Sequence, residues 1–156
     1  MLARAALVTR LFAILAAGAG AGLTIAALVL LHGATQVALL VPSFGASCAL
    51  VFGVPASPFA RPVSVIGGHL VSSAVRLATM ALLGHGVVAM ACGVGGAIAA
   101  MMATRTMHPP AGGDPLIVIA VSAAPTFLLV PILLGTVMIS LAGFAYQALI
   151  GQREHK

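Results

Sequence analysis

The chain has 156 residues, of which 62% are hydrophobic and only 6% charged, and its mean hydropathy is +1.21. A soluble domain carries about 25% charged residues, so this chain has too few to cover a water-facing surface, and the composition predicts one integral membrane domain over residues 1–156. The formal net charge of +5 comes from scattered single cations without a basic stripe, which excludes nucleic acid as an expected partner.

The first half of the chain contains three apolar segments. Residues 11–31 are long enough to cross a bilayer and too long for a signal-peptide core, so we expect a first transmembrane helix there. Residues 35–54 form a second segment, which "VPSFGAS" at 41–47 interrupts. After the turn-rich link "PASPFARPV" (55–63), a third segment covers residues 64–83.

The second half also contains three apolar segments. A tight turn "GHG" at 84–86 leads to a fourth segment at 87–104, and "TRTMHPPAGGDPLIV" follows. The fifth segment, 110–124, would rise only about 22 Å as a helix against a hydrocarbon core of about 30 Å, which predicts a short broken helix or a re-entrant half-helix. The sixth segment covers 126–150, and 151–156 form a polar tail.

The positions of the loop cations predict the topology. If residues 1–10 are cytoplasmic and all six segments cross, the links with Arg61 and Arg105 and the tail 151–156 are also cytoplasmic, and every loop cation lies on one side. Re-entrant second and fifth segments would instead place Arg61 and Arg105 outside. We expect the six-crossing arrangement, in the inner membrane if the source is bacterial.

The two interrupted segments resemble each other. "PSFGASCALVFG" begins at Pro42 and "PPAGGDPLIVIA" at Pro109, 67 residues later. Three crossings per unit would make the two units inverted relative to each other, and paired Gly/Pro-broken helices indicate a transporter's binding site. The expected fold is therefore an all-α polytopic helix bundle of two inverted three-segment units.

Each interrupted stretch is expected to start a helix at membrane depth. Proline suits the first turn of a helix, and the first N–H groups of a helix lack partners within it, so two such starts would favour an anion. Glycine lets a ligand approach the backbone, and serine supplies a hydroxyl donor. A structural kink is the alternative. The candidate substrate-binding residues of these stretches are Ser43, Gly45, Ser47, Pro109, Pro110, Gly112 and Gly113.

Four ionisable residues complete the candidate site. An arginine at membrane depth costs at least about 2.5 kcal/mol, so Arg76, in the middle of the third segment, is a candidate fixed cation for an anionic substrate. A structural pair of Arg76 with Asp114 is the alternative, and Asp114 is also a candidate helix cap. His69 and His108 are candidate anion donors or proton carriers, with structural roles equally open.

Other site chemistries lack support in the sequence. Cys48 and Cys92 lie in apolar segments and are expected to be buried, and the histidine spacing predicts no metal site. No catalytic motif, cofactor motif or pair of acids is present, so we do not expect an enzyme. Gly18 and Gly22 form a GxxxG pattern, interpreted as helix packing within one protomer, with a homo-oligomer seam as the alternative.

The chain resembles the HPP family of integral membrane proteins. The resemblance rests on His108-Pro109-Pro110 within "TRTMHPPAGG", with "PSFGAS" (42–47), "SPFARP" (57–62) and "GGHL" (67–70) in the family's order. It implies about four conserved transmembrane helices and, because plant chloroplast members are associated with nitrite uptake, a permeability to small anions. We therefore expect a transporter or channel for small monovalent anions, nitrite first. A structural or regulatory membrane subunit is the alternative, and a membrane enzyme ranks third.

Overall fold

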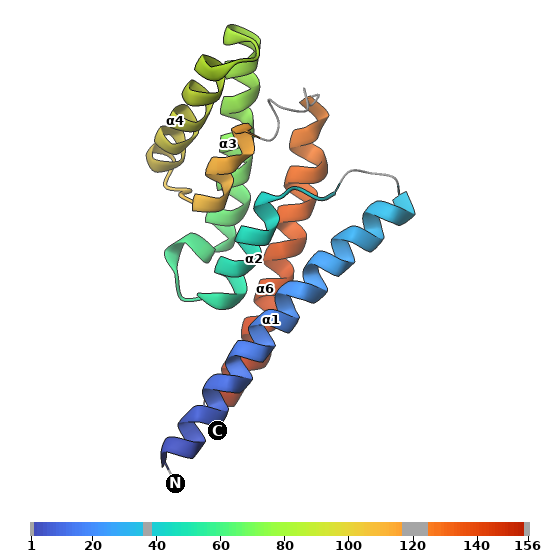
Figure 1. Ribbon diagram of the computed structural model, residues 1–156, viewed down its shortest axis with the longest axis vertical. Helices are drawn as coiled ribbons and strands as arrows, with labels where there is room; N and C mark the ends of the chain where they lie inside the picture. Colours follow the sequence, from blue (N-terminus) through green and yellow to red (C-terminus); the bar gives the residue numbers. More distant parts are fainter. Residues whose placement is uncertain (1, 36–38, 117–124, 155–156) are drawn as a thin grey trace.

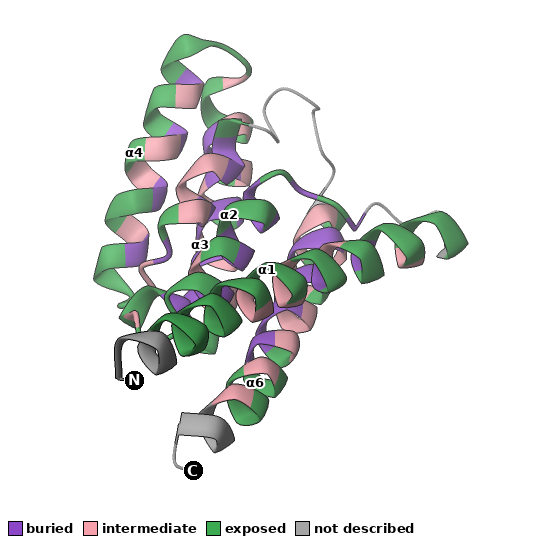
Figure 2. Ribbon diagram, turned by 60° about the horizontal axis from the view of Figure 1, so that its bottom comes forward, coloured by how far each residue is buried: buried purple, intermediate pink, exposed green. Residues whose placement is uncertain are grey.

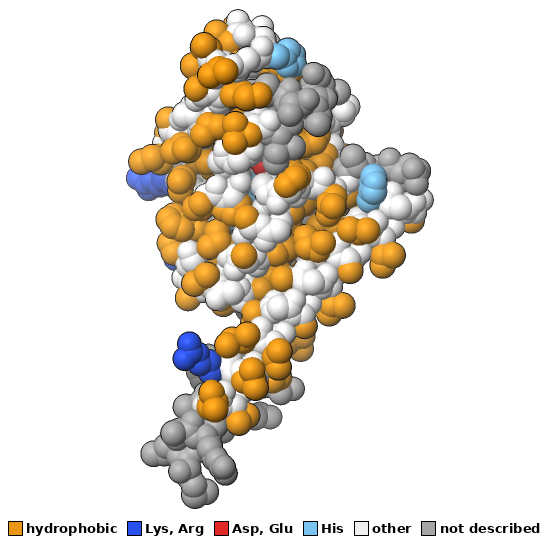
Figure 3. Space-filling model, in the orientation of Figure 1, with side chains coloured by type: hydrophobic (Ala, Val, Ile, Leu, Met, Phe, Trp, Pro, Cys, Tyr) orange, Lys and Arg blue, Asp and Glu red, His pale blue; other side chains and the backbone are white. Residues whose placement is uncertain are grey.

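A computed structural model of the chain describes residues 2–35, 39–116 and 125–154, and every regular element in these ranges is helical. Three helices in them are long and apolar enough to cross a membrane: α1 (Leu2–Thr35), α3 (Pro62–Leu83) and α6 (Leu134–Glu154) with the turns that precede it. The expectation of an all-helical fold is thus confirmed. Hydrophobic side chains are spread over the face shown in Figure 3, and blue side chains lie at its margins.

Helix boundaries follow the sequence pattern with one extension. Helix α1 begins at Leu2 rather than near residue 11, because residues 2–7 are mostly leucine and alanine, which favour helix. Helix α3 starts two residues early, at Pro62, where proline suits the first turn. Helix α4 (Val87–Ala103) matches the fourth segment, and Gly84, with φ of 70°, forms the predicted turn before it.

The second segment is broken where "VPSFGAS" predicts a break. Helix α2 (Ser43–Gly53) begins directly after Pro42 and has 11 residues, so it rises about 16 Å and covers only about half of a hydrocarbon core. A short turn, η1 (Pro58–Ala60), follows in the link before α3. The chain therefore places a helix start, rather than a continuous helix, in the interior of the molecule.

The fifth and sixth segments are less regular than expected. The turn η2 (Pro109–Gly113) leads into residues 114–116, which are helical, and residues 117–124 of the fifth segment lie outside the described ranges. The sixth segment was expected to be continuous, but it is divided into η3 (Pro125–Leu128), η4 (Leu129–Leu133) and α6. Val130 is extended (φ −139°, ψ 119°), because the residue before a proline, here Pro131, is driven out of helical geometry.

Helix α2 lies at the centre of the arrangement. It contacts α1 and α6 on one side and η2 on another, while α3 contacts α4, η2 and α6 (Figure 1). The apolar core combines α2 with α1, α3 and the start of α6, and includes Leu28, Phe44, Val51, Val65 and Ile132. Figure 2 shows the buried residues concentrated on α2 and α3, whereas α1 is mostly exposed.

The two cysteines differ in burial. Cys48 is buried in the core, as expected, but Cys92 is exposed, which corrects the expectation for the second thiol. The reason is that the buried positions of α4 recur every four residues and form one stripe, from Ala89 and Gly93 to Ala97 and Met101. Cys92 lies off that stripe, on the outer face of the helix.

The glycines of α1 also differ in their surroundings. A Cβ atom added to Gly20 would lie 2.7 Å from Cδ1 of Phe52, whereas one added to Gly18 or Gly22 would meet none of the described atoms within 4 Å. The close approach of α1 and α2 therefore uses Gly20 rather than the GxxxG pair. The face that carries Gly18 and Gly22 is exposed in the single chain.

We predict that Gly20→Ala lowers the stability of the protein and that Gly18→Ala does not. The added methyl at position 20 would displace the ring of Phe52, which also packs edge-on against Tyr146, and such overpacking costs about 1–3 kcal/mol. The measurement is the thermal midpoint of the detergent-solubilised protein. Equal effects at positions 18 and 20 would contradict this account of the α1–α2 contact.

Candidate anion and proton site

Helix α3 carries a buried polar stripe along its length. Apart from two neighbouring serines, its residues follow one another at intervals of three or four, so they share one helix face. They lie near the middle of a 22-residue helix, whose rise of about 33 Å matches a hydrocarbon core. Polar groups at this depth require partners from other elements. The stripe consists of His69, Ser72, Ser73, Arg76 and Thr79, all of them buried.

Asp114 is the acceptor at which three elements meet. The Nδ1 atom of His69 lies 2.7 Å from Oδ2 of Asp114, and Ser43, at the start of α2, donates its hydroxyl to Oδ1 at 2.7 Å. Ser73 donates more weakly to Oδ2 at 3.5 Å. The carboxylate is fully buried, so these bonds replace the water that it loses. The Asp114 carboxylate thereby joins α2 and α3 to the segment after η2.

Ser47 connects the two buried histidines. Its Oγ lies 2.9 Å from Nε2 of His69 and 2.9 Å from Nε2 of His108, and 3.0 Å from the backbone oxygen of Ser43. On the far side of its ring, Nδ1 of His108 lies 2.8 Å from the backbone oxygen of Phe59, in η1. A continuous series of polar contacts thus runs from Asp114 to the link before α3.

Small residues allow these elements to approach. A Cβ atom on Gly68 would lie 2.7 Å from Cβ of His108 and 2.7 Å from the backbone oxygen of Thr106. Only glycine at position 68 therefore lets the segment from Thr106 to His108 pack this closely against α3. Ser72 donates to the backbone oxygen of Ala111 at 2.6 Å and holds η2 in place. The motif "GGH" on α3 therefore carries His69 and gives His108 room beside it, and "SS" holds the turn that follows His108.

The structure brings together five of the predicted site residues: Ser43, Ser47, His69, His108 and Asp114. The prolines and glycines of the two stretches contribute differently. Gly45 and Pro109 are exposed, and Pro110, Gly112 and Gly113 are half-buried at the edge of the cluster. A Cβ atom at position 112 would meet no described atom within 4 Å, so this edge is open within the part of the chain that the structure describes.

Arg76 is fully buried one turn beyond Ser73, and its Nη2 donates to Sδ of Met80 at 3.4 Å. Among the described residues, Asp114 makes its short contact with the ring of His69 rather than with Arg76. The alternative of an Arg76–Asp114 pair therefore gives way to a His69–Asp114 pair. Arg76 remains a buried cation on the same helix face as the pair.

The second stretch does not start with an α-helix. Pro109 and Pro110 lead into the tight turn η2, because neither has an N–H group and both have fixed φ. Residues 114–116 after this turn are helical, so the expected helix begins at Asp114 rather than at Pro110. No group of three metal-binding side chains occurs within the ranges that the structure describes.

The cluster also contains residues that were not singled out from the sequence. Ser72 and Ser73 belong to the "HLVSSAVR" stretch, where polar residues three, four and seven positions after His69 share its face. That spacing could have identified them. The backbone oxygen of Phe59 has no comparable signal, since its role depends on how the link before α3 folds.

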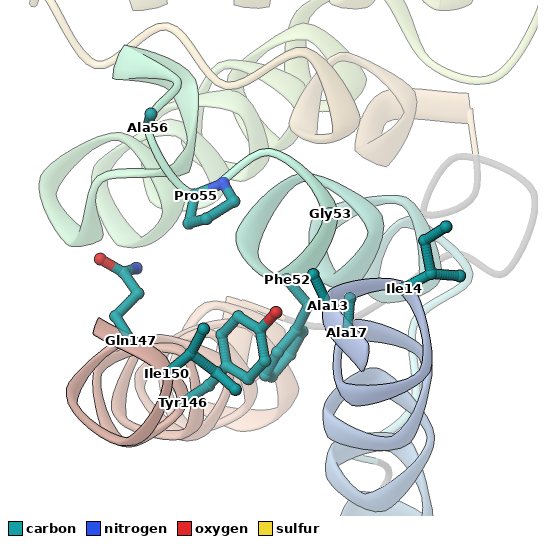
Figure 4. A pocket seen from close by; sticks show the side chains of 10 residues that line it. All are labelled: Ala13, Ile14, Ala17, Phe52, Gly53, Pro55, Ala56, Tyr146, Gln147 and Ile150. Atoms are coloured by element: carbon teal, nitrogen blue, oxygen red, sulfur yellow. The ribbon is translucent and has the colours of Figure 1, made fainter. Parts of the chain in front are cut away.

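A separate hollow of about 650 Å³ lies between α1, α2 and α6. Its lining is mainly apolar, with Phe52 at the end of α2 and with Tyr146 and Gln147 on α6, as Figure 4 shows. Ser43, at the other end of α2, does not line it, and neither do the histidines. The hollow is therefore distinct from the polar cluster.

The long apolar helices and the enclosed polar cluster define a helical membrane protein. The HPP transmembrane region family matches residues 7–156, so the chain belongs to this family. It is similar to two transmembrane proteins of Dictyostelium discoideum, one 34% identical over 77% of the chain and 45% of the relative, the other 42% identical over 50% and 26%. The chain thus matches less than half the length of either relative. No solved structure gives a significant match.

We predict that Asp114→Ala destabilises the protein far more than Ser43→Ala. Loss of the carboxylate leaves His69 and two serines without their acceptor, and each buried donor left unsatisfied costs about 1–3 kcal/mol. Removing the Ser43 hydroxyl deletes one hydrogen bond, worth about 0.6–1.7 kcal/mol within a membrane. Unfolding in mixed micelles with increasing denaturing detergent measures both. Similar losses would mean that the carboxylate does not organise the cluster.

Proposed function

We propose that this protein is a multi-pass transporter or channel for small monovalent anions, with nitrite as the first candidate, and that the anion passes through the polar cluster. The observation that carries the proposal is the complete burial of Ser47, His69, Arg76, His108 and Asp114 inside an otherwise apolar helical protein. Ionisable groups at such depth are expensive and characteristically mark a substrate or ion path. The choice of nitrite rests on the family resemblance alone.

The cluster contains a fixed positive charge that attracts an anion. This charge belongs to Arg76, which is fully buried. The open edge at Gly112 gives a small ion access to the cluster. Asp114 opposes this attraction, because two like charges about 4 Å apart repel by about 4 kcal/mol at an effective dielectric constant of about 20. An anion therefore binds when nearby positive charge offsets the negative charge of Asp114.

The arrangement of helices supports two inverted units of three segments. The contact of α3 with α4 corresponds to that of α6 with α1, and the contact of α2 with α6 corresponds to that of η2 with α3. Gly68 and Gly135 also lie 67 residues apart, like Pro42 and Pro109, and each allows close approach of the other broken stretch. A Cβ atom at Gly68 would clash with His108, and one at Gly135 with Phe44.

The topology that goes with this function has six crossings and two cytoplasmic ends. The start of α1 and the end of α6 lie at the same end of the molecule (Figure 1). The link that carries Arg61 would face the cytoplasm, and the α3–α4 link with His85 would face outside. Both residues are exposed in the structure, so both positions can be labelled.

We predict that, in a background with Cys48→Ala and Cys92→Ala, a membrane-impermeant maleimide labels His85→Cys but not Arg61→Cys from outside intact cells. The reason is the one-sided distribution of loop cations. Each variant is also labelled after membrane disruption, which controls for expression. Labelling of position 61 from outside would refute the six-crossing topology and make α2 re-entrant.

We predict that Gly112→Val abolishes protein-dependent nitrite uptake into proteoliposomes. The valine side chain meets no described atom that would prevent folding, but it occupies the open edge through which a ligand approaches. Gly95→Val is the matched control, since Gly95 is exposed on α4 and equally unobstructed. Nitrite is measured inside the vesicles at mildly alkaline pH, with protein-free vesicles subtracted for the leak of nitrous acid.

Two outcomes would reject the proposed path or the function itself. Full uptake by the Gly112→Val variant would move the path away from this edge of the cluster. Failure of the well-folded native protein to carry nitrite, nitrate or chloride would favour a structural or regulatory subunit instead. The exposed Gly18–Gly22 face is where a second copy of the chain would pack if the protein is a homo-oligomer.

A further inference from the structure

The polar cluster contains four successive contacts that each require one hydrogen. They join Asp114 to His69, His69 to Ser47, Ser47 to His108, and His108 to the backbone oxygen of Phe59, at 2.7, 2.9, 2.9 and 2.8 Å. The backbone oxygen can only accept, so Nδ1 of His108 carries a hydrogen. The ionised carboxylate also only accepts, so Nδ1 of His69 carries one too.

These two assignments leave the centre of the series short of one hydrogen. If both imidazoles are neutral, each Nε2 presents a lone pair to Ser47, whose single hydroxyl hydrogen can serve only one of them. One additional proton on either Nε2 removes the conflict, since Ser47 then accepts from one ring and donates to the other. The backbone oxygen of Ser43, 3.0 Å away, competes for the same hydroxyl hydrogen and adds no donor.

From this geometry we propose that the cluster holds one exchangeable proton, which passes between His69 and His108 through Ser47 and is carried together with the anion. The step is balanced. Nε2 of His69 gives its proton to Oγ of Ser47, and the hydroxyl hydrogen of Ser47 moves to Nε2 of His108. The positive charge moves from one ring to the other, and all four contacts keep their hydrogens. The proposal rests on the anion transport proposed above.

The charges of the surrounding elements fix the expected stoichiometry. Helix α3 contributes Arg76 and His69, the stretch around η2 contributes His108 and Asp114, and α2 contributes the neutral thiol of Cys48 next to Ser47. With both rings neutral, Arg76 and Asp114 balance each other. One bound proton makes the cluster singly positive, and one monovalent anion restores neutrality, so transport is expected to be electroneutral.

The two ends of the series differ in access. His108 contacts η1, and Phe59 there is 39% exposed, whereas the His69 and Asp114 end is fully buried opposite Ser73, in the middle of α3. The series therefore leads from mid-helix toward the link that carries Arg61. A proton on His108 is therefore held by a ring that directly contacts the backbone of the exposed link, at Phe59.

The test measures protons and anions together, using the full chain and sodium nitrite as the probe. In weakly buffered detergent solution, we expect the protein to take up one proton for each nitrite bound, as read by a pH indicator and by calorimetry. In phosphatidylcholine vesicles, nitrite uptake should acidify the interior in the same ratio and should not respond to an imposed membrane potential. A pH gradient of one unit, with the vesicle interior more alkaline, should raise nitrite accumulation about tenfold.

The variant Ser47→Ala tests the connection between the two histidines, because it removes the shared hydroxyl and little volume. We expect it to bind nitrite with almost no proton uptake and to slow nitrite-driven proton entry at least about 100-fold. Ser140→Ala is the matched control, because it removes a buried hydroxyl on α6, outside the cluster, so its ratio should stay at one. If Ser47→Ala does not fold, His108→Gln replaces it, with the same expected loss of proton uptake.

Three results would overturn the proposal. Nitrite binding without proton uptake, or uptake driven by the membrane potential, would leave anion transport intact and remove the coupling. A native proton ratio in folded Ser47→Ala would show that the proton does not pass through Ser47. Absence of nitrite and nitrate binding by the folded native protein would refute both this coupling and the proposed function.

Discussion

Burial of a single carboxylate is the constraint on which the architecture depends. Asp114 and the tail residue Glu154 are the only acids in the chain, and Asp114 is fully buried among helices that have little else to offer a charge. An uncompensated carboxylate in such surroundings would cost many kcal/mol, so a histidine and two serines must converge on it. This convergence brings the start of α2 to Asp114 and determines which face α3 turns inward.

The apolar core packs directly against the polar cluster and holds it in place. Phe44, next to Ser43, lies in the core and packs edge-on against the ring of His69, with ring centroids 5.5 Å apart. The two histidine rings lie 5.1 Å apart. Close packing of this kind restricts how the rings can turn, so the cluster can exchange hydrogens between fixed positions without large movements of the side chains.

The sequence indicates where the helices break but not which groups become partners. Proline and glycine at 42–45 and 109–113 disrupt a helix at their own positions. The breaks before α2 and before Asp114 were therefore predictable. The cost of buried charge likewise singled out Arg76. Pairing is a property of three-dimensional packing, however, and Asp114 joins His69 rather than Arg76. The kink at Val130 was missed although Pro131 was visible, because the surrounding residues are uniformly apolar.

The polar stripe of α3 also bears on how the chain enters the membrane as it is synthesised. Alone, α3 would expose histidine, two serines and arginine to lipid, and its mean hydropathy of 1.4 is well below the 2.3 of the other two long spans. The partners of this stripe include Ala111 and Asp114, which are synthesised only after α4. During translation, α3 must therefore wait in a polar or protein-lined environment, such as the insertion machinery, until the next thirty or so residues arrive to complete its inner face.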